Sequence, residues 1–316
     1  LGYKDFSLPN NALDAIEDEE INFSTQPLYG MYQPDTIQTY EVNGETYVIT
    51  ADEGDGREYE PTFEVGVLKQ TDDGTWGLDT TEDDGDNIDI EVDDSQFEDG
   101  VLSKLEGLEA TSEYGDVDDD GVIEEIYLFG ARSISIFDAD GNRIYESGDD
   151  IERRMAVELP DYFNTDDDEN DFDKESASSG PQPEGIAIGT PSDNTYAFVT
   201  MERTSGIMTF DVTDPARSEI IDYANSRNFD VDPEDDIEDG NESTDAAGDL
   251  SAEGVLFISE SQSPIKDPLL SVCYEVSGTT SLYRVQETTD VTVEDNIIND
   301  AEILDLIRFW RENTPL

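Results

Sequence analysis

The stretch that decides the fold is residues 181–212, PQPEGIAIGTPSDNTYAFVTMERTSGIMTFDV. It holds three short apolar runs, and the segments between them are rich in Gly, Ser, Asp and Asn. Short β-prone runs separated by turn residues predict consecutive antiparallel strands. One carboxylate, Glu184, comes just before the first run, and another, Glu202, directly follows the second.

The same order of turn, carboxylate and two strands recurs in residues 32–54 and 252–285. The paired carboxylates are 18, 18 and 22 residues apart in Asp35 and Glu53, Glu184 and Glu202, and Glu253 and Glu275. A further blade-like stretch, residues 124–145, contains the turn DADGN, which predicts a hairpin. Repeated units of short strands are typical of propeller blades. We therefore predict an all-β fold over residues 1–286, a β-propeller present whole or in part.

Three acidic segments between these units are poor in apolar residues and are predicted to be long surface loops: residues 71–100, 164–179 and 230–249. Residues 287–316 are predicted to form a separate region with a short amphipathic helix at 299–311. This region resembles a degenerate half of a dockerin or EF-hand. Its apolar face is expected to dock on the β domain or on a partner.

The charge of the chain is extreme, with 81 acidic residues, 16 basic residues and a net charge of -65 on 316 residues. Such self-repulsion requires screening, and molar salt shortens the Debye length to about 3 Å. We therefore expect a halophilic source. An acidic disordered chain is the alternative, but 35% hydrophobic and 9% aromatic residues favour a folded core. The charge predicts metal cations as partners and disfavours nucleic acid, and no apolar run reaches the length of a membrane span.

The absence of histidine excludes Ser-His-Asp and Cys-His catalysis and every His-ligated metal site. The single cysteine, Cys273, lies in an apolar run and is predicted to be a buried thiol. Two sequons, at Asn22 and Asn241, suit a glycosylated exterior protein.

Carboxylates are the remaining candidates for chemistry. Four of them follow the DxDxDGxxE spacing of a calcium loop: Asp116, Asp118, Asp120 and Glu124. Tyr127 stands where an EF-hand has its twelfth-position Glu, so we expect a strand-to-strand calcium loop. The alternative is a solvated acidic run.

The repeat carboxylates predict a second Ca²⁺ site. If the units surround an axis, Asp35, Glu184 and Glu253 converge, and carboxylates in contact stay ionised only with a cation between them. The alternative is that each carboxylate caps its own turn. Three arginines beside these motifs, Arg57, Arg132 and Arg203, either pair with carboxylates or clamp an anion.

The chain resembles the choice-of-anchor I family of secreted, surface-anchored β-propeller proteins. The resemblance rests on stretches such as TADEGDGREY at 50–59, YLFGARSISI at 127–136 and residues 8–15, 180–185, 206–208 and 275–280. It implies an extracellular or cell-surface protein, of haloarchaeal type, with a structural or assembly role. It also implies that the chain corresponds to a C-terminal portion of such proteins. Other copies or other surface proteins are the expected partners, through the loops and the C-terminal helix.

Residues 182–185 and 206–207 are also similar, more weakly, to the calcium-dependent β-propeller phytases, and some family members are labelled alkaline phosphatase-like. This similarity implies an alternative function as a calcium-dependent phosphoesterase, which needs no histidine. Its candidate catalytic residues are Glu53, Arg57, Glu184, Glu202 and Arg203.

Overall fold

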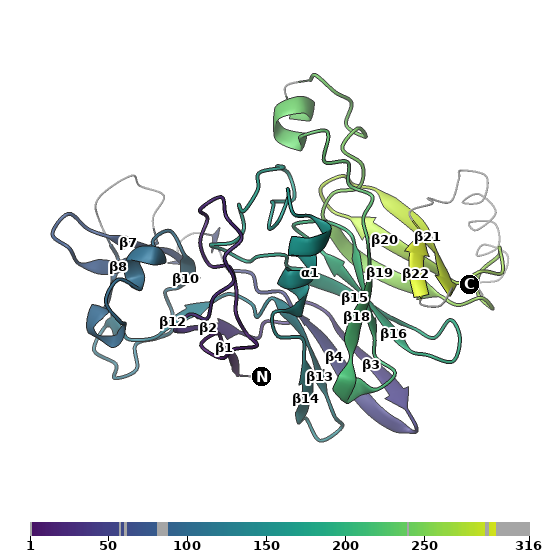
Figure 1. Cartoon of the computed structure of the whole chain (residues 1–316), viewed down its shortest axis with the longest axis horizontal. Helices are drawn as coiled ribbons and strands as arrows, with labels where there is room; N and C mark the ends of the chain where they lie inside the picture. The colour runs from purple at the N-terminus through teal and green to yellow at the C-terminus, as the bar shows by residue number, and fades with distance from the viewer. Residues whose placement is uncertain are drawn as a thin grey trace.

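The computed structural model describes residues 2–56, 58–59, 62–80, 88–238, 240–287 and 291–294. Three four-stranded antiparallel sheets, here called sheets 1, 2 and 3, form its main body (Figure 1). Sheet 1 comprises β3 (Ile37–Val42), β4 (Glu45–Asp52), β13 (Ser133–Phe137) and β14 (Arg143–Glu146). Sheet 2 comprises β15 (Pro183–Gly189), β16 (Tyr196–Met201), β17 (Ile207–Asp211) and β18 (Glu219–Ala224). Sheet 3 comprises β19 (Ala252–Ile258), β20 (Leu269–Tyr274), β21 (Thr280–Glu287) and β22 (Val291–Glu294).

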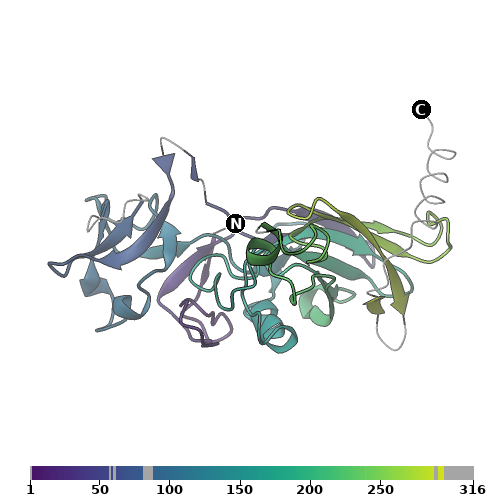
Figure 2. The ribbon, with the colours of Figure 1, turned by 90° about the horizontal axis from the view of Figure 1, so that it is seen from above.

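The three sheets meet through their first strands. Strand β15 packs against β3 and β4 on one side and against β19 on the other. The three sheets therefore lie side by side along a curve (Figure 2), and the described residues do not close them into a ring. The predicted all-β class is confirmed, whereas a complete propeller is not formed by the described part of the chain.

A long insertion, residues 53–132, interrupts sheet 1 between β4 and β13. It carries a five-stranded sheet and a short hairpin, and it lies at the opposite end of the molecule from sheet 3 (Figure 1). The five strands, in spatial order, are β10 (Glu109–Thr111), β7 (Val65–Gln70), β8 (Trp76–Asp79), β9 (Ile90–Val92) and β11 (Val122–Ile123). The hairpin pairs β5 (Glu58–Tyr59) with β6 (Thr62–Phe63).

This insertion corrects the predicted repeat count. Residues 32–54 and 124–145 were predicted as two units, but β3, β4, β13 and β14 belong to one sheet, because β13 pairs with β4. The predicted hairpin turn between β13 and β14 is confirmed. Local alternation identifies strands, but it carries no information about a partner 81 residues away.

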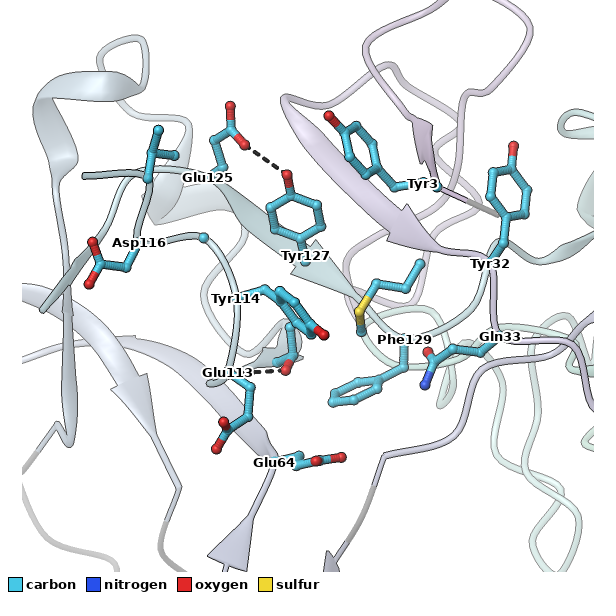
Figure 3. A pocket seen from close by; sticks show the side chains of 15 residues that line it. Tyr3, Tyr32, Gln33, Glu64, Glu113, Tyr114, Asp116, Glu125, Tyr127 and Phe129 are labelled. Carbon is cyan, nitrogen blue, oxygen red and sulfur yellow. Dashed lines mark hydrogen bonds between the residues drawn. The ribbon is translucent and has the colours of Figure 1, made fainter. Parts of the chain in front are cut away.

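A small sheet joins the chain start to the insertion. Strand β2 (Leu28–Met31) pairs antiparallel with β1 (Tyr3–Asp5) and parallel with β12 (Ile126–Leu128). Leu28, Ile126 and Leu128 are buried on one face of this sheet. The other face borders a cleft (Figure 3).

The helices in the described residues are short. They are α1 (Asp150–Glu158), the 3₁₀ helices η1 (Asp94–Gln96), η2 (Leu102–Lys104) and η3 (Pro215–Arg217), and a π-helix, η4 (Pro233–Glu238). None of these helices is long and apolar enough to cross a membrane.

Two of the predicted acidic loops are more ordered than expected. Residues 71–100 contribute β8 and β9, because Trp76 and Leu78 bury their side chains in the core of the insertion. Residues 164–179 contain the buried polar residues Asn164 and Asp173.

The prediction of a buried Cys273 is wrong. Its thiol is exposed, since the alternation of β20 turns Val272 and Tyr274 inward and Cys273 outward. At the C-terminal side, β22 extends sheet 3 past residue 286, and the helix predicted at 299–311 lies outside the described residues.

Candidate metal centre

Three of the repeat carboxylates meet where sheets 1 and 2 adjoin. Asp35 precedes β3, Glu53 follows β4, and Glu184 lies in β15. One oxygen atom from each of the three lies within 4.8 Å of the others. The packing of β15 against β3 and β4 produces this approach between residues nearly 150 positions apart.

A repeated irregularity of the backbone presents these carboxylates. The pairing of β15 with β16 shifts register between Pro183 and Ile186, and that of β19 with β20 shifts between Ala252 and Val255. Each shift contains a Glu-Gly pair, and bulges of this kind redirect a side chain. The repeat seen in the sequence is therefore a repeated local geometry.

Gly185 lets the two bulges approach closely. A Cβ atom there would lie 2.3 Å from the carbonyl oxygen of Glu253. Thr200 joins the two segments, because its hydroxyl accepts from the amide of Gly185 at 2.7 Å and donates to the carbonyl of Glu253 at 2.7 Å.

Glu184 is the most constrained member of the group. Only 5% of it is exposed, and its Oε2 atom is buried with no hydrogen-bond partner. Burial, together with the nearby carboxylates of Glu53 and Asp35, raises the pKa of Glu184 to about 10. Without a cation, this carboxyl group keeps its proton at neutral pH.

Burial also raises the pKa values of the carboxyl groups next to Glu184. Burial raises the pKa of Glu53 to about 7, although a hydrogen bond with Glu184 opposes the rise. Burial likewise raises the pKa of Glu202 to about 8, against the lowering effect of Arg203. A nearby positive charge is therefore needed for Glu53, Glu184 and Glu202 to be ionised together at neutral pH.

Glu253 stands at the edge of the group. It contributes to the raised pKa values of Glu53, Glu184 and Glu202, but it is not among the three residues whose oxygen atoms converge. Burial and its neighbour Glu275 raise the pKa of Glu253 itself.

The acidic loop brings together Asp116, Asp118, Asp120 and Glu124, each with one oxygen atom within 4.8 Å of the others. Its backbone folds onto its own side chains. The amides of Asp120 and Gly121 donate to Asp116 at 3.0 and 2.8 Å, and the amide of Val117 donates to Glu124 at 2.7 Å. The three Asp side chains are exposed, so this geometry also suits a solvated turn.

Arg203 is paired. Its Nη1 atom lies 2.8 Å from Asp166 and 3.2 Å from Asp167, and its Nε donates to Gln182. Arg203, Asp166 and Gln182 line a cavity of about 200 Å³. The sequence indicated the arginine but missed its partners, because residues 164–179 were predicted to be a surface loop. Arg57 lies outside the described residues.

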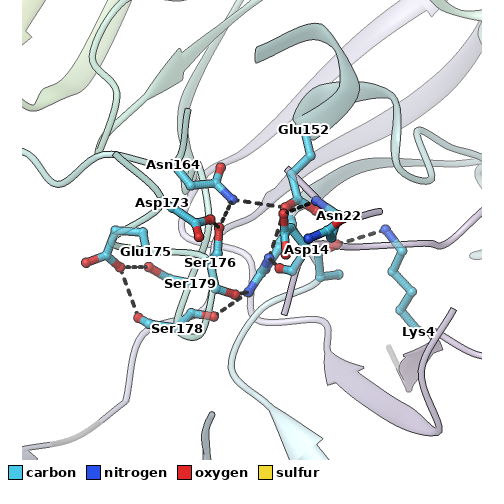
Figure 4. A network of polar contacts seen from close by, with 12 residues as sticks. Lys4, Asp14, Asn22, Glu152, Asn164, Asp173, Glu175, Ser176, Ser178 and Ser179 are labelled. Atoms are coloured by element: carbon cyan, nitrogen blue, oxygen red, sulfur yellow. Dashed lines mark hydrogen bonds and ion pairs between the residues drawn. The ribbon is translucent and has the colours of Figure 1, made fainter. Parts of the chain in front are cut away.

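Arg132 is also buried and paired, and its partners Asp14, Glu152, Ser176 and Ser178 belong to the polar network of Figure 4. Its guanidinium contacts Glu152 of α1 at 3.0 Å and donates to the carbonyl of Asp14 at 2.7 Å. It also donates to the carbonyls of Ser176 and Ser178 at 2.9 and 2.7 Å. This network ties the N-terminal segment, α1 and the chain before sheet 2 to one side chain.

The raised pKa values predict how stability depends on pH in chelator. Since the folded state holds more protons than the unfolded state above pH 5, the free energy of unfolding should fall as pH rises from 7 to 9. The expected slope is up to about 1.4 kcal/mol per pH unit for each proton released. No histidine titrates in this range. Urea denaturation at fixed salt measures the slope, and Glu184→Gln should flatten it. A slope unchanged by that substitution would contradict the assignment.

Residues 1–215 match the family model of the choice-of-anchor I domain. The chain belongs to the choice-of-anchor I family. This membership implies a surface-associated or extracellular protein. The matched residues include sheet 1, the first three strands of sheet 2, the insertion and all three convergent carboxylates, whereas β18 and sheet 3 follow them.

The choice-of-anchor I chain is also similar to Gigasin-3a of Magallana gigas, with 27% identity over 179 residues. The aligned part covers 53% of this chain and 60% of Gigasin-3a, so it spans less than two thirds of that relative. No solved structure matches the chain.

Proposed function

We propose that the chain is a surface-associated β protein that binds Ca²⁺ between sheets 1 and 2, where the ion stabilises their junction. The observation that carries this proposal is the buried Oε2 atom of Glu184, which lacks a hydrogen-bond partner beside two further carboxylates. Ca²⁺ binds oxygen ligands at about 2.3–2.6 Å, so oxygen atoms that share one ion lie within about 5 Å of one another. The separations among Asp35, Glu53 and Glu184 satisfy this condition.

The three sheets are proposed to be consecutive blades of a propeller. Support comes from their common four-stranded antiparallel form and from the contacts of β3 and β4 with β15 and of β15 with β19. In this arrangement the carboxylates lie at the inner strands, where a bound ion joins one blade to the next.

The acidic loop is proposed as a second, more exposed Ca²⁺ site. Its support is the spacing and convergence of Asp116, Asp118, Asp120 and Glu124. The expected effect of an ion there is to order the loop at the edge of the insertion.

A structural role is favoured over a phosphoesterase activity. Phosphate binding needs a positively charged group that is open to the substrate, and Arg203 is occupied by Asp166, Asp167 and Gln182. The net charge of -65 opposes the approach of phosphate esters.

The charge also supports a hypersaline setting, such as that of a halophilic archaeon. Exposed carboxylates repel one another less as the Debye length falls. Both sequon asparagines, Asn22 and Asn241, are exposed, which is compatible with glycosylation outside the cell.

Calcium titration of chelator-treated protein in molar KCl tests the proposal. Isothermal titration calorimetry is expected to show a binding event that Glu184→Gln weakens by at least about tenfold, because the substitution removes a charged ligand. Glu260→Gln, an exposed residue in the loop after β19, is the matched control and should leave binding unchanged. Asp118→Asn removes a ligand of the acidic loop alone, so a binding event that only this substitution weakens belongs to that loop. Identical calcium isotherms for the wild type and Glu184→Gln would refute the site.

A further inference from the structure

The small sheet formed by β1, β2 and β12 presents aromatic rings on its open face. Tyr29 is paired in register with Tyr127, and Tyr3 is paired with Met31. Alternation places these side chains on the face opposite to the buried Leu28. Tyr3, Met31 and Tyr127 line a cleft of about 690 Å³, and residues within 111–117 of the insertion form part of its wall (Figure 3).

The rings are held in place by one another. Tyr29 and Tyr127 stack with centroids 5.1 Å apart, and Tyr3 meets them edge-on at 4.9 and 5.3 Å. Tyr114, from the insertion, lies 6.4 Å from Tyr127. Tyr3 and Tyr114 are nevertheless 53% and 62% exposed, so a preorganised aromatic surface faces solvent.

Carboxylates surround this aromatic surface. Glu64, Glu113, Asp116 and Glu125 line the cleft, and no Lys or Arg does so among the residues described there. Tyr127 donates to Glu125 at 2.8 Å, and burial together with Glu125 raises the pKa of Tyr127.

The charged groups of the cleft are carboxylates, which accept hydrogen bonds. Gln33 uses both ends of its amide internally, since its Oε1 accepts from Gly130 at 3.0 Å and its Nε2 donates to the carbonyl of Asp55 at 3.2 Å. A complementary ligand therefore brings donors and positive charge. Guanidinium and ammonium groups are donor-only cations that also bind to the faces of aromatic rings.

We propose that this cleft binds an organic cation, the guanidinium or ammonium group of a basic ligand. Phosphate and carboxylate ligands are repelled by its four carboxylates, and small inorganic cations gain less from the rings because their hydration is strong. The rings and carboxylates act together, since a cation over an aromatic face keeps part of its binding energy in salt that screens the carboxylates. The site is separate from the junction carboxylates, but it shares Asp116 with the proposed Ca²⁺ site of the acidic loop, so the two are tested separately by working in chelator.

Two peptides of the same shape test the proposal. Acetyl-Gly-Arg-Gly-amide is expected to bind to the full chain at least about tenfold more tightly than its citrulline analogue, which keeps the shape and removes the charge. Titrations followed by tyrosine fluorescence or calorimetry, at one fixed concentration of KCl and with chelator, give both affinities. Tyr114→Leu and Glu113→Gln should each weaken binding of the arginine peptide by about threefold or more. Both positions are exposed, so these variants are expected to fold. Glu260→Gln should bind as the wild type does.

The outcomes are distinct. Displacement of the peptide by N-methylguanidinium at similar affinity would support the site with a small free cation as its ligand, whereas preference for the peptide would support a basic protein segment. Equal affinity for the arginine and citrulline peptides, or no binding of either, would overturn the proposal. An equal loss in Glu260→Gln and Glu113→Gln would also overturn it, because it would assign the attraction to overall charge.

Discussion

Arg132→Met is expected to lower the free energy of unfolding by about 3–5 kcal/mol, the usual cost of removing one partner from a buried ion pair. Methionine retains much of the volume of the side chain but none of its donors. Glu152 would keep a buried charge without its partner, and three backbone carbonyls would lose their donor. Because Glu152 and those carbonyls belong to three separate segments, the loss should affect the whole region around α1.

Urea denaturation in molar KCl measures this effect. Arg217→Met is the matched control, since the Arg217 side chain is 85% exposed and lies 4.0 Å from Asp214. It should change the free energy by less than about 0.5 kcal/mol. Adding Glu152→Gln to Arg132→Met should restore part of the loss by removing the unpaired charge. A loss below about 1 kcal/mol in Arg132→Met would show that the network contributes little.

Gly54→Ala is expected to lower the free energy of unfolding by about 2–5 kcal/mol, as the sum of left-handed backbone strain and overpacking. Gly54 has φ of 85°, and a Cβ atom there would lie 1.8 Å from the backbone nitrogen of Gly130. The chain entering the insertion crosses the chain leaving it at these two glycines. An alanine must push the two chain segments apart, and it would also move the adjacent Glu53 away from Glu184.

Gly44→Ala separates the two causes. Gly44 has φ of 84°, but its Cβ would meet nothing within 4 Å, so only the backbone strain of about 1 kcal/mol applies. Gly54→Ala should also weaken Ca²⁺ binding, which Gly44→Ala should leave unchanged. Equal destabilisation in the two variants would mean that the crossing is not tightly packed.

The sequence predicts sheet 2 well because the patterns that identify its strands are local. Turn residues and alternation in residues 181–212 correspond to β15, β16 and β17 almost residue by residue. The approach of Glu184 to Asp35 and Glu53 could also be predicted from the sequence, since repeated units place equivalent residues at equivalent positions. Glu253 was placed with them by the same reasoning, and it lies near the group without joining its closest members.

The missed features depend on contacts that no local pattern encodes. The pairing of β13 with β4 spans the insertion, and the strand signal at 126–128 belongs to β12, which pairs with β2 and not with sheet 1. The partners of Arg132 come from distant segments, so their chemistry is not visible as a motif. Cys273 was misplaced because an apolar run does not say which of its members faces outward.

The insertion within sheet 1 has a consequence for biosynthesis. Asp52 and Ser133 are register partners 81 residues apart, so at about 5–20 residues per second the ribosome completes one half of the sheet about 4–16 s before the other. Until then, β3 and β4 form a two-stranded hairpin, which has little stability alone and an edge open to other chains. The many carboxylates synthesised in that interval repel neighbouring nascent chains. The negative charge of the chain is therefore expected to limit pairing between nascent chains before β13 and β14 are made.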